Sequence, residues 1–93
     1  MPAELIDRSR TDLEDGSFVS IVIWRVPRPV RGSAHYFKYR LAYVVDGICV
    51  LRFDNEAGKG DHVHVGDQEH PYVFTSTETL LADFRAAVLG WRG

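Results

Sequence analysis

Apolar and polar residues alternate along much of the first two thirds of this chain, which is the pattern of half-buried β-strands. Two Asp-Gly pairs, Asp15-Gly16 and Asp46-Gly47, each lie between such runs. Asp-Gly favours a two-residue turn, because both central residues of a type I′ turn need positive φ. The sequence therefore predicts two β-hairpins, one around each pair.

A two-residue turn also fixes which residues face each other across a hairpin. In the first hairpin we expect Leu13 opposite Phe18 and Leu5 opposite Val26. The pairs expected in the second hairpin are Val45–Ile48, Tyr43–Val50, Leu41–Arg52, Tyr39–Asp54 and Lys38–Asn55. The faces expected from these pairs hold Tyr39, Arg52 and Asp54 on one side, and Lys38, Arg40 and Asn55 on the other. A slip of one residue would exchange the two faces.

The remainder of the chain predicts further strands and one helix. Pro27 and Pro29 should end the second strand, because proline cannot donate into a ladder. Residues 28–34 then form an exposed basic connection. Short strands are expected at Val63 to Val65 and at Tyr72 to Phe74, separated by a polar turn from Gly66 to Pro71.

The helix is predicted from a capping box in Thr75-Ser76-Thr77-Glu78, with Thr75 as N-cap and Glu78 at the third helical position. Four apolar residues then follow helical spacing: Leu80, Leu81, Phe84 and Val88. Gly90 should end the helix. The expected fold class is α+β, an antiparallel meander of four to six strands with one C-terminal amphipathic helix packed on the sheet.

Length and composition limit the possibilities further. The 93 residues are 45% hydrophobic and suit one domain over 1–93, with no room for a second core. No apolar run is long enough for a membrane helix, and the N-terminus lacks the regions of a signal peptide, so we expect a cytoplasmic protein. Cys49, the single cysteine, lies in an apolar run and reads as a small hydrophobe. Trp24 and Trp91 read as core or interface residues, and of the two we expect the core.

Charge is distributed unevenly. The stretch from Arg25 to Lys59 contains seven basic and three acidic residues, so its formal charge is +4, whereas the formal charge of the whole chain is −2. Two interpretations stay open: solvated strand surface of mixed sign, or one basic face with acidic ends. A net-acidic chain weakens any argument for nonspecific nucleic-acid binding.

The stretch from Arg52 to His64, R-F-D-N-E-A-G-K-G-D-H-V-H, holds the densest set of titratable groups. Three chemistries fit it. Histidines can transfer protons in metal-free RNA cleavage while lysine and arginine stabilise the phosphate. Carboxylates and imidazoles could bind a metal, although their spacing matches no zinc motif. Gly58-Lys59-Gly60 could cradle a phosphate, although the stretch is not a P-loop. His35 and His70 lie outside this cluster and read as ordinary surface or hydrogen-bonded residues.

The chain resembles the TumE-type toxins of prokaryotic toxin–antitoxin systems. The resemblance rests on H-Y-F-K-Y-R-L-A-Y-V-V-D-G, on D-N-E-A-G-K-G-D-H within the stretch above, and on P-Y-V-F before L-L-A-D-F. It implies a small cytoplasmic toxin that a cognate antitoxin, typically a helix-turn-helix protein, neutralises. The family has been likened to the RelE and ParE toxins, among which RelE types cleave messenger RNA at the ribosome and ParE types inhibit gyrase.

Together these patterns favour a toxin that cleaves RNA, either free or bound to the ribosome, with neither metal nor cofactor. His62 is the expected acid or base with His64 as its partner, Lys59 and Arg52 hold the scissile phosphate, and Asp61 orients a histidine. The remaining candidate binding residues are Lys38, Tyr39, Arg40, Asp54, Asn55, Glu56, Gly58 and Gly60. Two alternatives remain: a non-enzymatic toxin that occupies a protein target such as gyrase or the ribosome, and a silent regulatory partner of a DNA-binding protein. A homodimer is also compatible, because a meander leaves a sheet edge to cover.

Overall fold

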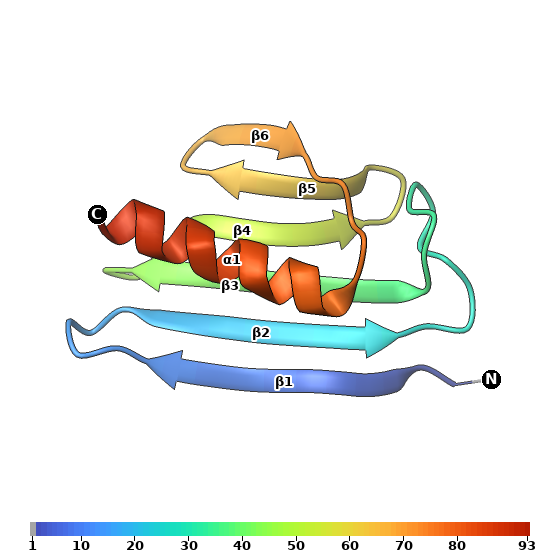
Figure 1. Cartoon of the computed structure of the whole chain (residues 1–93), viewed down its shortest axis with the longest axis horizontal. Helices are drawn as coiled ribbons and strands as arrows, with labels where there is room; N and C mark the ends of the chain where they lie inside the picture. Colours follow the sequence, from blue (N-terminus) through green and yellow to red (C-terminus); the bar gives the residue numbers. More distant parts are fainter. Residues whose placement is uncertain (1) are drawn as a thin grey trace.

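In the computed structural model, which describes residues 2–93, one antiparallel sheet runs in chain order from β1 to β6 with a helix across one face (Figure 1). This confirms the predicted α+β meander with a C-terminal helix. Within residues 2–93 no helix is long and apolar enough to cross a membrane. The elements are β1 (Glu4–Asp12), β2 (Phe18–Arg25), β3 (Phe37–Val45), β4 (Ile48–Glu56), β5 (Gly60–Val65), β6 (Gln68–Pro71) and α1 (Thr77–Arg92).

The first hairpin has a longer turn than predicted, and its register differs by one residue. Phe18 faces Asp12 instead of Leu13, and beyond an irregularity between Leu5 and Asp7, Leu5 faces Trp24 instead of Val26. The turn closes through a hydrogen bond from the Leu13 N–H to the Ser17 carbonyl, and the buried Ser17 donates its own N–H to the Asp15 carboxylate. Since the Asp15 side chain bonds the turn from within, the loop spans five residues and the two-residue prediction was wrong.

The second hairpin begins as predicted and then shifts. Val45 faces Ile48 and the turn residue Asp46 has a φ of +52°, as an Asp-Gly turn requires. Tyr43 faces Leu51 instead of Val50, because β4 carries an extra residue there. Such a β-bulge moves every later side chain by one position relative to the partner strand. The pairs predicted beyond the turn, and both predicted faces, were therefore wrong.

The last two strands also differ from prediction. The expected strand from Val63 to Val65 belongs to the longer β5, whereas Tyr72 to Phe74 forms no strand. Instead β6 occupies Gln68–Pro71, where a polar turn was expected. The turn is confined to Gly66 and the residue after it. The polar residues that follow belong to an exposed edge strand and not to a loop.

The helix ends lie close to the predicted ones. Ser76, not Thr75, is the N-cap, and its hydroxyl accepts the Thr79 N–H at 3.0 Å. The helix continues through Gly90 to Arg92. Arg92 then bonds the hydroxyl of Tyr43 and the carboxylate of Asp15, which ties the helix end to the first hairpin and offsets the cost of an internal glycine.

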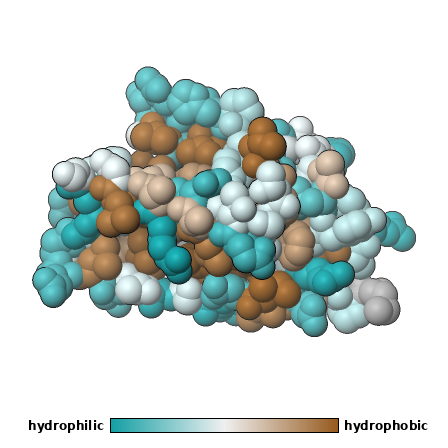
Figure 2. Space-filling view, viewed as in Figure 1, coloured by the Kyte–Doolittle hydropathy of each residue, from teal (hydrophilic) through white to brown (hydrophobic). Residues whose placement is uncertain are grey.

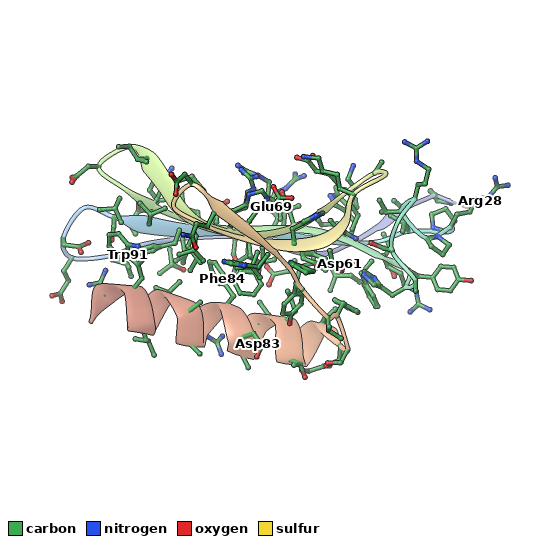
Figure 3. All side chains as sticks on the ribbon, turned by 90° about the horizontal axis from the view of Figure 1, so that it is seen from above. Arg28, Asp61, Glu69, Asp83, Phe84 and Trp91 are labelled. Atoms are coloured by element: carbon green, nitrogen blue, oxygen red, sulfur yellow. The ribbon has the colours of Figure 1, made fainter. Side chains whose placement is uncertain are left out.

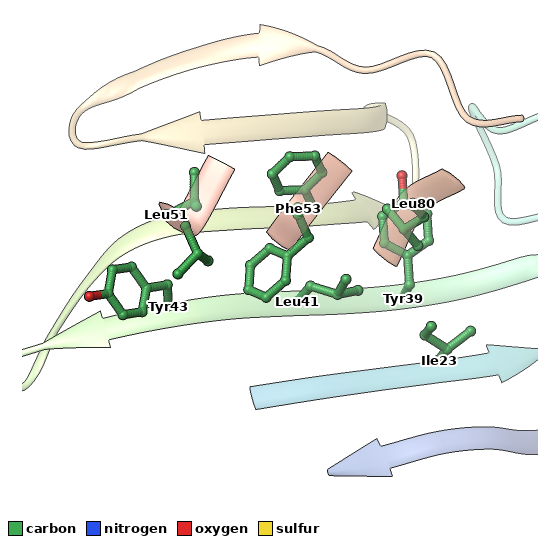
Figure 4. Packing of buried hydrophobic residues seen from close by; sticks show 9 residues of the cluster. Ile23, Tyr39, Leu41, Tyr43, Leu51, Phe53 and Leu80 are labelled. Atoms are coloured by element: carbon green, nitrogen blue, oxygen red, sulfur yellow. The ribbon is translucent and has the colours of Figure 1, made fainter. Parts of the chain in front are cut away.

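The core lies between the helix and the sheet face that it covers. Leu80, Phe84 and Val88 are the buried helix residues, so the predicted apolar stripe is confirmed. They meet alternate residues of the central strands (Figure 4). These strand residues are Ile23, Tyr39, Leu41, Tyr43, Leu51 and Phe53. Seen from the helix side, hydrophobic residues are exposed only in separate patches between polar residues (Figure 2).

The opposite face of the sheet, which we call the open face, carries no helix. In Figure 3 Phe84 lies between helix and sheet, whereas Glu69 lies on the side away from the helix. Because side chains alternate along a strand, the neighbours of buried strand residues belong to the open face. Trp24, which follows buried Ile23, is one of them, so its predicted place in the core was wrong. Trp91 is also outside the core, half exposed against Tyr43.

Candidate functional site on the open face

Two rows of directly paired residues cross the open face. Because paired residues of neighbouring strands lie on the same face, each row forms one line of side chains from β1 towards β6. The first row is Arg8, Val22, Arg40, Asp54 and His62. The second row is Arg10, Ser20, Ala42, Arg52, His64 and Glu69. The bulge in β4 produces this alignment, which brings both loop histidines beside two arginines.

His62 is fixed at both ring nitrogens. Its Nδ1 lies 2.8 Å from the carbonyl oxygen of Gly60, and its Nε2 lies 3.1 Å from Oε1 of Glu69. Both partners are acceptors when Glu69 is ionised, so the ring lies between two acceptors. These two contacts hold the orientation of the His62 ring. Sequence reasoning did not include Glu69, because it comes from a strand that was read as a turn.

His64 stands beside His62 with looser contacts. The centroids of the two rings are 6.1 Å apart. Nδ1 of His64 is 3.6 Å from Oε2 of Glu69, and its Nε2 is 3.7 Å from Oδ1 of Asp54. Both distances exceed those of a hydrogen bond, so a ring nitrogen of His64 is available as an acceptor.

A buried carboxylate lies beneath His64. Asp54 is 5% exposed, and its Oδ2 lies 2.9 Å from Nε of Arg52. Neither that Nε nor Oδ1 of Asp54 has a hydrogen-bond partner of good geometry. A buried oxygen without a partner is costly, so Oδ1 is ready to accept a proton donor. A small turn of a protonated His64 ring would supply one.

Basic side chains border this group. Lys38, Arg40, Arg52 and Asp54 line a shallow cavity of about 360 Å³ on the open face, together with the end of β4. Lys38 and Arg40 are exposed, and Arg52 is half-buried. The cavity thus places three cations around one buried carboxylate, next to the histidine pair.

Three of the predicted site residues lie on the other face of the sheet. Asp61, Tyr39 and Asn55 point to the helix side, and both Tyr39 and Asn55 are buried. Asp61 accepts hydrogen bonds from the hydroxyl groups of Ser33 and Tyr39, each at 2.6 Å. It does orient a histidine as expected, but that histidine is His35 rather than one of the loop pair.

His35 was set aside by sequence reasoning, yet it is central to this second cluster. Its Nε2 lies 2.7 Å from Oδ2 of Asp61, its Nδ1 accepts the Phe37 N–H, and its ring stacks on Phe74 at 3.8 Å. Both ring nitrogens of His35 are therefore engaged. The His35–Asp61 pair is separated by 26 residues in sequence, and only the fold reveals it.

The charges and hydrogen bonds around His35 and Asp61 indicate a structural role, in which they hold the 26–36 connection against the sheet. Burial raises the pKa of the Asp61 carboxyl, but the hydrogen bonds from Ser33, Tyr39 and His35 outweigh it and hold that pKa below its usual range. Burial and the bond to Asp61 raise the pKa of the Tyr39 hydroxyl above its ordinary value. Asp61 thus remains charged and Tyr39 neutral, and both tie the 26–36 connection to the sheet.

The glycine loop serves the same connection. The Gly58 N–H donates to the carbonyl of Arg31, and the Lys59 N–H donates to the carbonyl of Glu56. A Cβ at Gly60 would lie 2.8 Å from the Gly32 oxygen. These backbone groups are used within the protein, so they form no phosphate cradle. Lys59 is exposed, and Glu56 lines the end of the cavity.

The stretch from Arg52 to His64 was also predicted to be able to bind a metal ion through its carboxylates and imidazoles. Within residues 2–93, no three His, Cys, Asp or Glu side chains converge in a way that could hold a metal ion. Glu69 instead contacts both His62 and His64, and Asp54 contacts His64.

The family model described as toxin TumE matches residues 2–92, which is nearly the whole chain. The chain belongs to the toxin TumE family. This confirms the resemblance read from its motifs and gives the protein a toxin role. No curated protein and no solved structure matches the chain. A proposed function therefore rests on two observations, the membership of the TumE family and the geometry of the open face.

Proposed function

We propose that this TumE-family chain is the toxin of a toxin–antitoxin system and cleaves RNA on its open face without a metal. The observation that carries the proposal is the histidine pair at 6.1 Å, beside Arg40 and Arg52 on one uncovered surface. Acid–base catalysis needs each catalytic group about 3 Å from the oxygen whose proton it transfers, so two groups about 6 Å apart can bracket one phosphodiester.

The reaction follows from the groups present. The 2′-oxygen of a ribose attacks the adjacent phosphorus while a base removes the 2′-hydroxyl proton. The bond from phosphorus to the 5′-oxygen breaks, and an acid protonates that leaving oxygen. The products are a 2′,3′-cyclic phosphate and a 5′-hydroxyl, and neither oxidant nor further reactant is needed.

The contacts of each histidine suggest its role. His62, whose two ring nitrogens face the acceptors of Gly60 and Glu69, is the acid. Glu69 is half exposed, so it can release Nε2 when a phosphate arrives. His64 has a free ring nitrogen and is the base. Once it has taken the proton, the unpartnered Oδ1 of Asp54 stabilises the charged ring.

The cations around the cavity complete the site. Arg52 and Arg40 hold the scissile phosphate, whose charge increases in the transition state. Lys38 contacts the flanking backbone, and Lys59, at the exposed β4–β5 turn, does the same from the other side. We further propose a helix-turn-helix antitoxin as partner, supported by the TumE membership.

Growth of cells that express the protein without its antitoxin tests this proposal. Wild type should arrest growth, His62→Ala should not, and His70→Ala should arrest growth like wild type. His70 is the matched control, because it is exposed on β6 and pairs with Val63 on the helix side. Full toxicity of a variant that lacks both His62 and His64 would instead establish a toxin that acts by occupying its target.

A further inference from the structure

Trp24 is an aromatic side chain on the open face that core packing does not explain. It follows Ile23, which is 1% exposed in the core, so it points away from the helix. It is half-buried and lies outside the hydrophobic core cluster. Tryptophan is enriched at interfaces, so a tryptophan outside the core on a polar surface is a candidate contact residue for a ligand.

The surroundings of Trp24 are basic. Lys38 is its direct partner on β3, and the guanidinium of Arg8 lies 5.7 Å from the centre of its ring. Phe18, on the same face, differs in this respect: Arg10 covers its ring at 3.7 Å and is itself bonded to Asp12. Both rings are partly buried, but Arg8 lies farther from the Trp24 ring than Arg10 lies from the Phe18 ring, so the Trp24 ring is less closely covered.

A basic path joins Trp24 to the histidine pair. Trp24 lies on β2 and His62 on β5, which are three strand spacings or roughly 14 Å apart. Lys38 and Arg40 lie on β3 between them, and both are exposed. The spacing suits a strand of nucleic acid whose phosphates contact β3 while one of its bases reaches β2.

We propose that Trp24 is a stacking subsite for an unpaired base of single-stranded RNA, with Lys38 and Arg40 holding the backbone that leads to the histidines. This inference deepens the proposed ribonuclease function and relies on it for the direction of the strand. Stacking on an aromatic ring tolerates every base, because each base has a π-face. A duplex, whose bases are already stacked and paired, cannot use Trp24.

Tryptophan fluorescence tests the subsite directly, because the chain has two tryptophans on opposite faces of the sheet. In a His62→Ala background, Trp91→Phe leaves Trp24 as the sole reporter, and Trp24→Phe leaves Trp91. The probes are a fluorescently labelled single-stranded RNA of mixed sequence and the same RNA annealed to its complement, with binding followed by anisotropy.

We expect the single strand to quench Trp24 and leave Trp91 unchanged. Trp24→Ala should weaken its binding roughly 5- to 150-fold, the range for one stacked base, and Trp24→Phe should weaken it less. Binding of the duplex should be insensitive to Trp24→Ala. Circular dichroism checks the fold of each variant, and the Trp91→Phe protein keeps Trp24 in its native surroundings.

Tight RNA binding without quenching of Trp24 would overturn the inference, and so would the absence of RNA binding, which would make the open face a protein-docking surface. The proposed function fails separately. Quenching without cleavage by the wild type would leave an RNA-binding toxin with Trp24 in its site, whereas cleavage without quenching would leave a ribonuclease that lacks this subsite.

Discussion

Asn55 provides a sharp test of how the structure reassigns a residue that looked functional from the sequence. It is 2% exposed, its Oδ1 accepts the Tyr39 N–H at 2.9 Å, and its Nδ2 donates to the Phe37 carbonyl at 2.7 Å. A further bond reaches the Ser33 hydroxyl at 3.3 Å. The side chain thus takes the place of a ladder partner at the end of β3, and Asn55→Ala removes all three bonds.

The expected cost follows from the groups left without partners. A buried N–H or carbonyl that loses its hydrogen bond costs about 1–3 kcal/mol. Two backbone groups are affected, and water can reach the small space left by the amide, so we expect Asn55→Ala to lower the free energy of unfolding by about 2–4 kcal/mol. This is a large part of the roughly 5–15 kcal/mol that stabilises a typical domain.

Urea denaturation, followed by circular dichroism, measures this loss. The midpoint should fall by at least about 1 M without a change in the slope. Gln68→Ala, which removes an exposed amide from edge strand β6, is the control and should change stability by less than about 0.5 kcal/mol. An Asn55→Ala protein as stable as this control would refute the reasoning.

Two further predictions concern the anchor of the 26–36 connection. Gly60→Ala should lower the free energy of unfolding by more than about 1 kcal/mol, because φ is +79° and the new Cβ would lie 2.8 Å from the Gly32 oxygen. Gly16→Ala is the control in the same urea assay. Because Gly16 has a φ of +87° and nothing within 4 Å of the new Cβ, this variant measures the cost of the backbone conformation without a steric clash. The pKa of Asp61 is lowered in the folded protein, so its stabilisation is complete above its ordinary pKa of 3.8 and is lost as the pH falls through the lower folded value. Asp61→Asn should therefore flatten the dependence of stability on pH below about pH 4, and an unchanged acid profile would contradict this.

Much of the fold could be predicted because its determinants are local. Alternation in the first half, the Asp46-Gly47 turn and the apolar spacing from Leu80 to Val88 each depend on neighbours in sequence. The bulge at Val50 does not, because a single extra residue inside an apolar run leaves the alternation signal almost intact. That residue shifted the register of β4, so Asn55 lies on the same face as Tyr39 instead of opposite Lys38.

The candidate site was predictable in its composition but not in its geometry. The sequence indicated His62 and His64 by their spacing, and both lie on one face with Arg52 and Arg40. It could not indicate Glu69, whose strand is entirely exposed and reads as a turn. Nor did it separate Asp61 from the loop histidines, because the strand was expected to begin at Val63; β5 begins at Gly60, so Asp61 and His62 point to opposite faces.

RNA cleavage by the purified protein tests the central claim most directly. Labelled RNA is incubated with wild type, His62→Ala and His70→Ala, each with and without EDTA, and the ends of the products are analysed. We predict cleavage by wild type and His70→Ala that survives EDTA and leaves 2′,3′-cyclic phosphate ends, and no cleavage by a correctly folded His62→Ala. Equal cleavage by His62→Ala, or cleavage that EDTA abolishes, would contradict the account.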